Sequence, residues 1–525
     1  MSVPIRIRRN RSTFCLLLVA VALLAAACTT SKPAATSAKS ATTTNPKATP
    51  PSGSWPYPNA DLANTRQAPG STISSANVSK LQQAWTFRVT SAPDGGTGVL
   101  TAAPVVVDGV VYTQDMQANV YALDLATGKQ RWEYPVNVQE PGGPGPDGVA
   151  VADGVVYGDS AHAAFALSAA TGKPIWVDRS LLDSAQGAFD IQPQAVGGRV
   201  YLASSLGAGS GGGILLALDA ATGKVIWKFN TMVGSTVPAA GGAWEPPLVG
   251  SDGSVTFGTG NPYQTPANAI AHPTQLLYSD SAVNLDAATG KLRWYYQAVP
   301  NDYQDHDLQT SPIAASVNGT SAIIAAGKMG YVYAIDAQTG DLIWKTPVGV
   351  HNGHDNDGAL ALQHQLHLTA PFTLEPAWLG GVLSNPAVAD DTVYVSTDDA
   401  PIGYTKLTQY LAPALAHPPT GEIEALNLAT GAVEWDTKLP EMAFGAATVS
   451  NDLVFSTLYG GELIALNRST GAIVYRHQLP TSTNAPLVVA GNTVIVSAGG
   501  PTTRGLVAGN STPSGNAQVV AYTVP

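Results

Sequence analysis

One segment of the sequence brings carboxylates and amides close enough together to form a reaction centre. It reads WYYQAVPNDYQDHDLQTSP from Trp294 to Pro312 and contains Asp305 and Asp307. A carboxylate can accept a proton, and together with amide oxygens it can coordinate a hard cation. A solvated acidic loop on the protein surface would have the same composition, so the residues alone leave both interpretations open.

Three residues elsewhere in the chain could contribute to a ligand site. Trp244 offers a large aromatic face, which suits a planar ring. Asn261 offers an amide oxygen, although asparagine before proline is also common in turns. Lys328 lies in the apolar stretch AAGKMGYVYAID, where a cation would stabilise developing negative charge. A packing tryptophan, a turn asparagine and a surface lysine are the corresponding structural alternatives.

A second polar loop follows further along the chain. It reads HNGHDNDG from His351 to Gly358, and His364 and His367 come soon after it. Histidine and aspartate can bind metals, but their spacing here matches no strict ligand pattern. We therefore expect a polar loop beside the central funnel of the fold rather than a separate metal site.

An internal repeat supplies the elements that must position these residues. Each copy reads as a strand, a tight turn and a second strand that ends in an aromatic residue. Asp or Asn can hydrogen-bond the turn backbone, and Gly supplies the positive φ that the turn needs. Trp244 is out of register with these aromatics, so the repeat does not explain it. The copies are ALDLATGKQRW (122–132), ALSAATGKPIW (166–176), ALDAATGKVIW (217–227), NLDAATGKLRW (284–294), AIDAQTGDLIW (334–344), ALNLATGAVEW (425–435) and ALNRSTGAIVY (465–475).

A second hairpin pattern, such as APVVVDGVVYTQD, precedes most copies. Two hairpins per repeat predict a four-stranded antiparallel unit, the blade of a β-propeller. The long gap between Trp344 and Trp435 indicates one blade with an insertion. An eighth blade begins at Ala485 and lacks its own Trp ending, while LQQAWTFRV with Trp85 is an unpaired strand near the start. We expect this strand to join the last blade and close the ring, which gives an all-β fold of eight blades over residues 55–525.

These motifs resemble the tryptophan-docking repeats of the quinoprotein alcohol dehydrogenases, which depend on pyrroloquinoline quinone (PQQ) and are eight-bladed propellers. The stretch WPYPNADLANTRQAP, from Trp55 to Pro69, is also similar to the opening segment of that family. The resemblance covers the whole of residues 55–525. It is specific for the fold but weak for activity, because non-enzymatic propeller lipoproteins of outer-membrane assembly share the docking repeat.

The resemblance implies a role for each candidate residue. Trp244 matches the tryptophan on which the quinone stacks, and Asn261 matches an amide ligand of the active-site metal, Ca²⁺ or a lanthanide. Asp305 matches the catalytic aspartate, which is the base and also contacts the metal. Asp307 stands where lanthanide-using members place a further aspartate, and Lys328 where the family has an Arg or Lys beside the reactive quinone oxygens.

Three features of the family are missing from this chain. The Glu that binds the metal has no counterpart, since Ala208 aligns with it. The Arg that holds a quinone carboxylate is replaced by Asp147 or Gly148. The disulfide between adjacent cysteines is absent as well. These departures favour an alternative in which the propeller is a non-catalytic binding or assembly scaffold.

The N-terminus is typical of an exported lipoprotein. Residues 1–27 combine four arginines with a short apolar core, as a signal peptide does, and Leu24-Ala25-Ala26-Ala27-Cys28 resembles a lipobox. Residues 28–54 are a Ser/Thr/Pro/Ala-rich stretch that we expect to be a disordered tether behind a lipidated Cys28. An ordinary cleavage site with a chance cysteine is the alternative. We therefore expect an extracytoplasmic protein that is anchored to the membrane through lipid only.

Composition narrows the possible partners. The formal net charge is −11, which argues against a nucleic-acid partner. The only cysteines are Cys15 and Cys28, and no C-x-x-C-H motif for covalent haem is present. If the chain is a dehydrogenase of a small alcohol-type substrate, its electrons must therefore leave to a separate acceptor.

Overall fold

The computed structural model describes residues 53–68, 70–90, 98–137, 145–183, 186–205, 212–232, 241–411, 415–500 and 517–525. The predicted signal peptide, Cys28 and nearly all of the predicted tether lie outside these residues, and they stay predictions. Within the described ranges, no helix has the length and apolar character needed to cross a bilayer.

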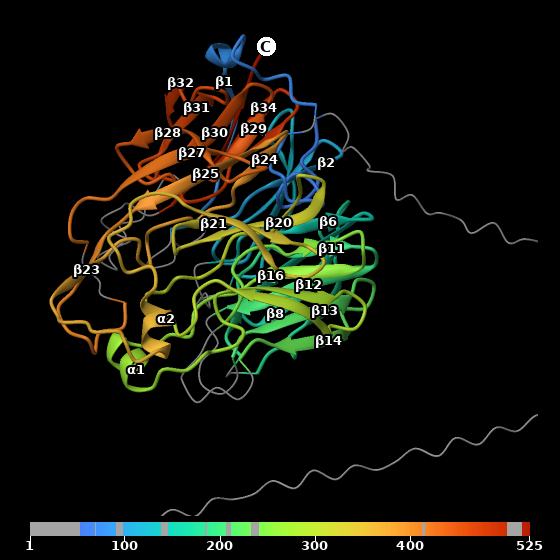
Figure 1. Ribbon diagram of the computed structural model, residues 1–525. Coiled ribbons are helices and arrows are strands. Elements are labelled where there is room, and N and C mark those ends of the chain that lie inside the picture. Colours follow the sequence, from blue (N-terminus) through green and yellow to red (C-terminus); the bar gives the residue numbers. More distant parts are fainter. Residues whose placement is uncertain are drawn as a thin grey trace, which may run out of the picture. The chain divides into compact units, whose positions relative to one another are not determined.

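Eight antiparallel sheets of at least four strands follow one another along the chain, so the predicted eight-bladed propeller is confirmed (Figure 1). Their strands are short and rich in Val, Ile and Tyr, which pack well on a pleated surface. The first four blades consist of β2 (Val105–Val107), β3 (Val110–Gln114), β4 (Val120–Asp124) and β5 (Gln130–Tyr134); β6 (Ala150–Ala152), β7 (Val155–Ser160), β8 (Ala163–Ser168) and β9 (Pro174–Asp178); β10 (Ala188–Phe189), β11 (Gln194–Val196), β12 (Arg199–Ser205), β13 (Ile214–Asp219) and β14 (Val225–Asn230); and β15 (Leu248–Val249), β16 (Ser254–Gly258), β17 (Ser281–Asp286) and β18 (Leu292–Gln297).

The second half of the ring repeats this order, and its last sheet takes one strand from the N-terminal part. The other four blades consist of β19 (Ile313–Val317), β20 (Thr320–Gly327), β21 (Tyr331–Asp336) and β22 (Leu342–Pro347); β24 (Ala387–Ala389), β25 (Thr392–Asp399), β27 (Thr420–Asn427) and β28 (Val433–Leu439); β29 (Thr448–Ser450), β30 (Leu453–Thr457), β31 (Glu462–Asn467) and β32 (Ile473–Gln478); and β33 (Val488–Ala490), β34 (Thr493–Ala498), β35 (Gln518–Thr523) and β1 (Gln82–Arg88).

The repeat motif joins each blade to the next. Its Trp donates the indole N–H to a backbone carbonyl in the following motif, at 2.8–3.1 Å, and its ring covers the Gly of that motif. At Gly290, for example, an added Cβ would lie 2.7 Å from the Trp227 ring. Only glycine tolerates both this contact and the φ of 69° at the turn. The sequence motif is therefore a joint between blades as well as a hairpin.

The N-terminal strand closes the ring, as predicted. β1 pairs antiparallel with β35, so the first strand of the fold lies at the edge of the last blade. Trp85 then donates to the Leu125 carbonyl at 2.8 Å and covers Gly128 of the first blade. It is the docking tryptophan that the eighth blade lacks in sequence order. The β1–β35 pairing and the Trp85 contact therefore join the last blade to the first.

The segment before β1 fills the centre of the ring. Backbone hydrogen bonds tie it to the first strands of several blades, through Val106, Ala314, Val388 and Val449. Arg66 is fully buried there and donates to the carbonyls of Ala447 and Leu487 and to the side chains of Asn59 and Thr448. The opening segment therefore supports the floor of any central cavity.

The sixth blade carries the predicted insertion. It contains helix α2 (Asp357–Leu362) and the two-stranded sheet of β23 (Phe372–Leu374) and β26 (Ile402–Tyr404). A short helix of the fourth blade, α1 (Pro266–Ala271), packs against α2, and both appear beside β23 in Figure 1. A one-turn 3-10 helix (Val78–Lys80) precedes β1. The insertion and α1 share an apolar cluster that includes Tyr303, so they reach the predicted catalytic segment.

Candidate active site

A cavity of about 480 Å³ lies where the segments that lead into the first strands converge. Innermost strands of several neighbouring blades contact one another, as β2 and β6 or β24 and β29 do, which places this cavity at the inner edge of the blades. Every blade contributes at least one wall residue, which lies before the first strand in seven blades and between β10 and β11 in the third. In blade order these are Thr101, Asp147, Gln192, Trp244, Asp305, Asn385, Phe444 and Asn484.

Three of the predicted site residues line this one cavity, namely Trp244, Asp305 and Lys328. Trp244 and Asp305 precede the first strands of the fourth and fifth blades, and Lys328 follows β20 of the fifth blade. The Lys328 ammonium lies 5.8 Å from the centre of the Trp244 ring. Residues 84 positions apart in sequence are thus brought to the same space, which the repeat alone does not reveal.

Lys328 bridges the two predicted acidic residues. Its Nζ lies 2.7 Å from Asp305 Oδ2 and 2.6 Å from Asp307 Oδ2, and the three side chains are 11%, 6% and 1% exposed. Burial opposes the charge of the ammonium, but the two carboxylates outweigh it and raise the pKa of Lys328. Burial also raises the pKa of Asp305 to about 7; Lys328 opposes this rise and Asp307 adds to it.

Asp305 is held in an unusual backbone conformation. Its φ of 66° lies in the left-handed region, which few residues other than glycine adopt. Asp302, which is fully buried, accepts the N–H of Gln304 at 2.7 Å and that of His306 at 2.8 Å. Its carboxylate therefore clamps the backbone on both sides of Asp305.

The sixth-blade insertion supports the same segment from outside. Tyr303 donates its hydroxyl to Asp357, and Gln304 Nε2 donates to the His354 carbonyl at 3.2 Å. His306 Nε2 bonds to the Pro376 carbonyl at 3.1 Å. The polar loop that begins at His351 thus packs against the Asp305 segment. The spacing of His and Asp in the loop had not indicated that it supports the Asp305 segment.

Asn261 and Asp307, the other two predicted site residues, bond to each other and are not among the residues that line the cavity. The Asn261 backbone N–H donates to Asp307 Oδ1 at 2.6 Å, and its side-chain Oδ1 accepts the Tyr263 N–H at 3.3 Å. The buried Nδ2 of Asn261 has no partner among the described residues. Gly260 has no side chain between them, and an added Cβ would come within 2.8 Å of both Asp307 Oδ1 and Trp244 Nε1.

The predicted cofactor fits this arrangement in part. The face of Trp244 and the apolar walls from Trp378, Leu379 and Phe444 suit a flat ring. Asn261, Asp305 and Asp307 provide hard oxygen donors, but the Lys328 ammonium already occupies the position between the two carboxylates. Among the described residues, no three His, Cys, Asp or Glu side chains are grouped to hold a metal. The residues therefore fit the quinone ring, whereas they do not form a ready metal site.

Two acidic wall residues had no predicted role. Glu245 follows Trp244 directly, and its Oε2 accepts a hydrogen bond from Asn385 Nδ2 at 2.9 Å. Asp147 lines the cavity where the resemblance led us to expect the Arg of the family. Ala208, which aligns with the family's metal-binding Glu, lies outside the described residues. The only sequence signal for Glu245 was its position beside Trp244, and the family resemblance assigned no role to it.

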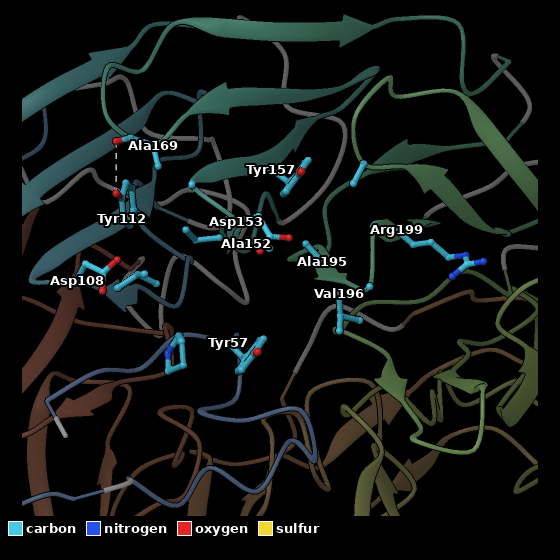
Figure 2. A pocket seen from close by; sticks show the side chains of 17 residues that line it. Tyr57, Asp108, Tyr112, Ala152, Asp153, Tyr157, Ala169, Ala195, Val196 and Arg199 are labelled. Carbon is cyan, nitrogen blue, oxygen red and sulfur yellow. Dashed lines mark hydrogen bonds between the residues drawn. The ribbon is translucent and has the colours of Figure 1, made fainter. Parts of the chain in front are cut away.

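A second cavity, of about 420 Å³, is lined mainly by hairpins of the first three blades, those between β2 and β3, β6 and β7, and β11 and β12. Figure 2 shows Tyr57 from the opening segment below Ala152 and Asp153, with Asp108 on another turn and Arg199 at the start of β12. None of the predicted site residues lines this cavity. It therefore provides acidic residues for control substitutions remote from Trp244 and Asp305.

Comparison with known proteins supports the same family. The model of the glucose/ethanol/alcohol dehydrogenase β-propeller domain matches residues 55–175 and 250–377, and that of the outer membrane protein assembly factor BamB matches residues 419–518. Lupanine 17-hydroxylase [cytochrome c] from Pseudomonas sp is 31% identical over 315 residues, which cover 52% of this chain and 44% of the relative. Quinohemoprotein alcohol dehydrogenase from Comamonas testosteroni is 29% identical over 349 residues, covering 58% and 48%.

The matches to these two relatives thus span less than half of their length. The crystal structure of the Comamonas testosteroni enzyme superposes with a TM-score of 0.75 at 21% identity, covering 90% of this chain and 80% of that one. At this identity the superposition shows the shared fold alone. Taken with the docking repeats, the comparisons show an eight-bladed β-propeller that is similar to the PQQ β-propeller domain and resembles the quinoprotein alcohol dehydrogenases.

Proposed function

We propose that this chain is a PQQ-dependent dehydrogenase that oxidises the hydroxyl group of an alcohol, polyol or sugar. The observation that carries the proposal is the convergence of Trp244, Asp305 and Lys328 on one central cavity. A non-catalytic propeller has no need to bring an aromatic face, a carboxylate and a buried ammonium to the same space.

Each residue has a role that follows from its surroundings. Trp244 supports the flat ring, and the apolar wall formed by Trp378, Leu379 and Phe444 keeps bulk water away. Asp305 is the base that takes the hydroxyl proton of the substrate, since a carboxylate with a pKa of about 7 is suited to proton transfer near neutral pH. Lys328 holds Asp305 in place and stabilises negative charge that develops beside it. The bound quinone would supply the hydride acceptor.

Purified protein should be loaded with PQQ and either Ca²⁺ or a lanthanide, and tested with a dye acceptor and a panel of alcohols, polyols and sugars. We expect PQQ to bind at micromolar concentration. Asp305→Ala should lower kcat by at least about a hundredfold, because it removes the general base. Asp108→Ala, at the second cavity, is the matched control and should leave kcat unchanged. Failure to bind PQQ, or full activity in Asp305→Ala, would overturn the proposal.

The lipobox motif and the polar stretch after it support a location outside the cytoplasm, with the protein anchored through acylated Cys28. No covalent haem motif is present, so electrons would pass to a separate carrier. Metabolic labelling with a fatty acid tests the anchor. Label should be incorporated into the wild-type chain and lost in Cys28→Ala.

A scaffold role is the second candidate, and two observations favour it. Residues 419–518 match the BamB family model, and the acidic Asp147 lines the cavity where a quinone-binding enzyme would be expected to carry an Arg. This candidate predicts that a partner protein co-purifies with the chain and that PQQ does not bind. The binding measurement above therefore separates the two functions.

A further inference from the structure

The central cavity contains two carboxylates that the proposed reaction does not use. Asp147 and Glu245 both line it, together with Trp244. Neither forms a salt bridge among the described residues: Glu245 accepts an amide hydrogen bond from Asn385, and the hydroxyl of Thr101 lies beside Asp147. Two acidic groups thus face a space that is proposed to receive an anionic ligand.

The other charged groups around this pair do not neutralise it directly. Asp190 and Asp159 are buried close to Asp147; the hydroxyl of Ser205 lies beside Asp190, and the carboxylate oxygens of Asp159 have no hydrogen-bond partner among the described residues. Arg66 attracts Glu245 electrostatically, but the guanidinium donates its hydrogen bonds to neutral acceptors, namely two backbone carbonyls and the side chains of Asn59 and Thr448. Lys328, the other cation of the cavity wall, is bound by Asp305 and Asp307.

Protonation of Asp147 or Glu245 would reduce the negative charge of this pair. Burial disfavours an ionised carboxylate, and two neighbouring carboxylates disfavour it further. Burial raises the pKa of Glu245 to about 7, against the opposing effects of Asn385 and Arg66. It also raises the pKa of Asp147, to which Glu245, Asp190 and Asp159 add. A ligand that carries carboxylates increases the repulsion, so its binding favours the protonated form of the pair.

We propose that Asp147 and Glu245 take up a proton when the anionic quinone binds, and that the resulting carboxyl group donates a hydrogen bond to a carboxylate of the cofactor. A neutral carboxyl donor would then take the place of the Arg that the resemblance led us to expect. This inference rests on the proposed function, since it takes PQQ as the ligand. The proposed proton uptake makes the binding of PQQ depend on pH.

The probe is PQQ alone, added to the full-length protein. Calorimetry in two buffers with different ionisation enthalpies gives the number of protons taken up, and titrations from about pH 6 to pH 9 give Kd. We expect proton uptake to approach roughly one proton per PQQ as the pH rises above 7, where Glu245 in the free protein ionises. Kd should then weaken by up to about tenfold per pH unit, the limit for one linked proton.

Two neutral variants test which groups take up the proton. Asp147→Asn and Glu245→Gln should each reduce the proton uptake and flatten the pH dependence of Kd. Both should bind PQQ more tightly than the wild type at about pH 8.5, because they remove a negative charge from the cavity wall. Asp108→Asn, at the second cavity, should keep the wild-type pH dependence. Circular dichroism of each variant checks that the propeller is folded.

The outcomes separate the inference from the function on which it rests. If PQQ binds the wild type without proton uptake and with a constant Kd, the inference is wrong and the proposed function stands. The same holds if both variants keep the wild-type pH dependence. If PQQ binds to neither the wild type nor the variants at any pH, both the proposed function and the inference are wrong.

Discussion

Lys328 offers the most direct test of the central site, because one ammonium neutralises two buried carboxylates. We expect Lys328→Met to leave Asp305 and Asp307 without a cation at distances where the native protein has contacts of 2.7 and 2.6 Å. With side chains that are 6% and 1% exposed, water cannot fully replace the lost partner. Breaking a buried pair on one side typically costs about 3–5 kcal/mol, and we expect a loss of that size in the free energy of unfolding.

Urea unfolding near neutral pH in the presence of a chelator measures this loss. Addition of Ca²⁺ or a lanthanide should then restore part of it in Lys328→Met and have less effect on the wild type, where the ammonium occupies the position between the carboxylates. Lys129→Met makes the same change at an exposed residue and should shift the unfolding free energy by no more than about 0.5 kcal/mol. A loss below about 1 kcal/mol in Lys328→Met would refute the reasoning.

Three further substitutions test the support of the site and the ring. Asp302→Asn keeps one acceptor for the two N–H groups beside Asp305, so one charge-assisted hydrogen bond, about 1.5–3 kcal/mol, is lost. We expect kcat to fall roughly tenfold or more, with little change in the Kd for PQQ. An unchanged kcat would contradict the role of Asp302 in holding the backbone on both sides of Asp305. Gly260→Ala places a Cβ 2.8 Å from Asp307 and Trp244, so fluorescence titration should show weakened PQQ binding, and wild-type affinity would speak against the packing described. Trp85→Ala should lower the unfolding free energy by about 3–5 kcal/mol in urea, and Trp85→Phe by less; equal losses would argue that the ring face is not what matters.

The fold could be predicted because its information is local and repeated. Each docking motif carries its own turn glycine and its own aromatic residue, and every copy points to the same hairpin. The structure added that the aromatic belongs to the joint with the next blade, as Trp227 and Gly290 show. It also showed that Trp85, 390 positions before the last copy ends at Tyr475, completes the set at the closure. Sequence order hides that relation, because closing a ring brings the two ends of the repeat array together.

The candidate site depended on the tertiary structure to a much greater degree. Resemblance predicted roles for Trp244, Asn261, Asp305, Asp307 and Lys328, but only the fold brings them to one cavity or next to it. It also placed Asp147 and Glu245 in the same wall, which no local pattern indicated.

The sequence by itself therefore determined the blades, their number and the strand that closes them, since hairpins and docking joints are encoded within short segments. Only the tertiary structure decided the electrostatics of the centre. Eight separate segments supply its wall, and burial, charge neighbours and the Lys328 bridge arise when they meet. The pKa values and the binding preference of the site therefore depend on contacts between these segments and not on any one segment alone.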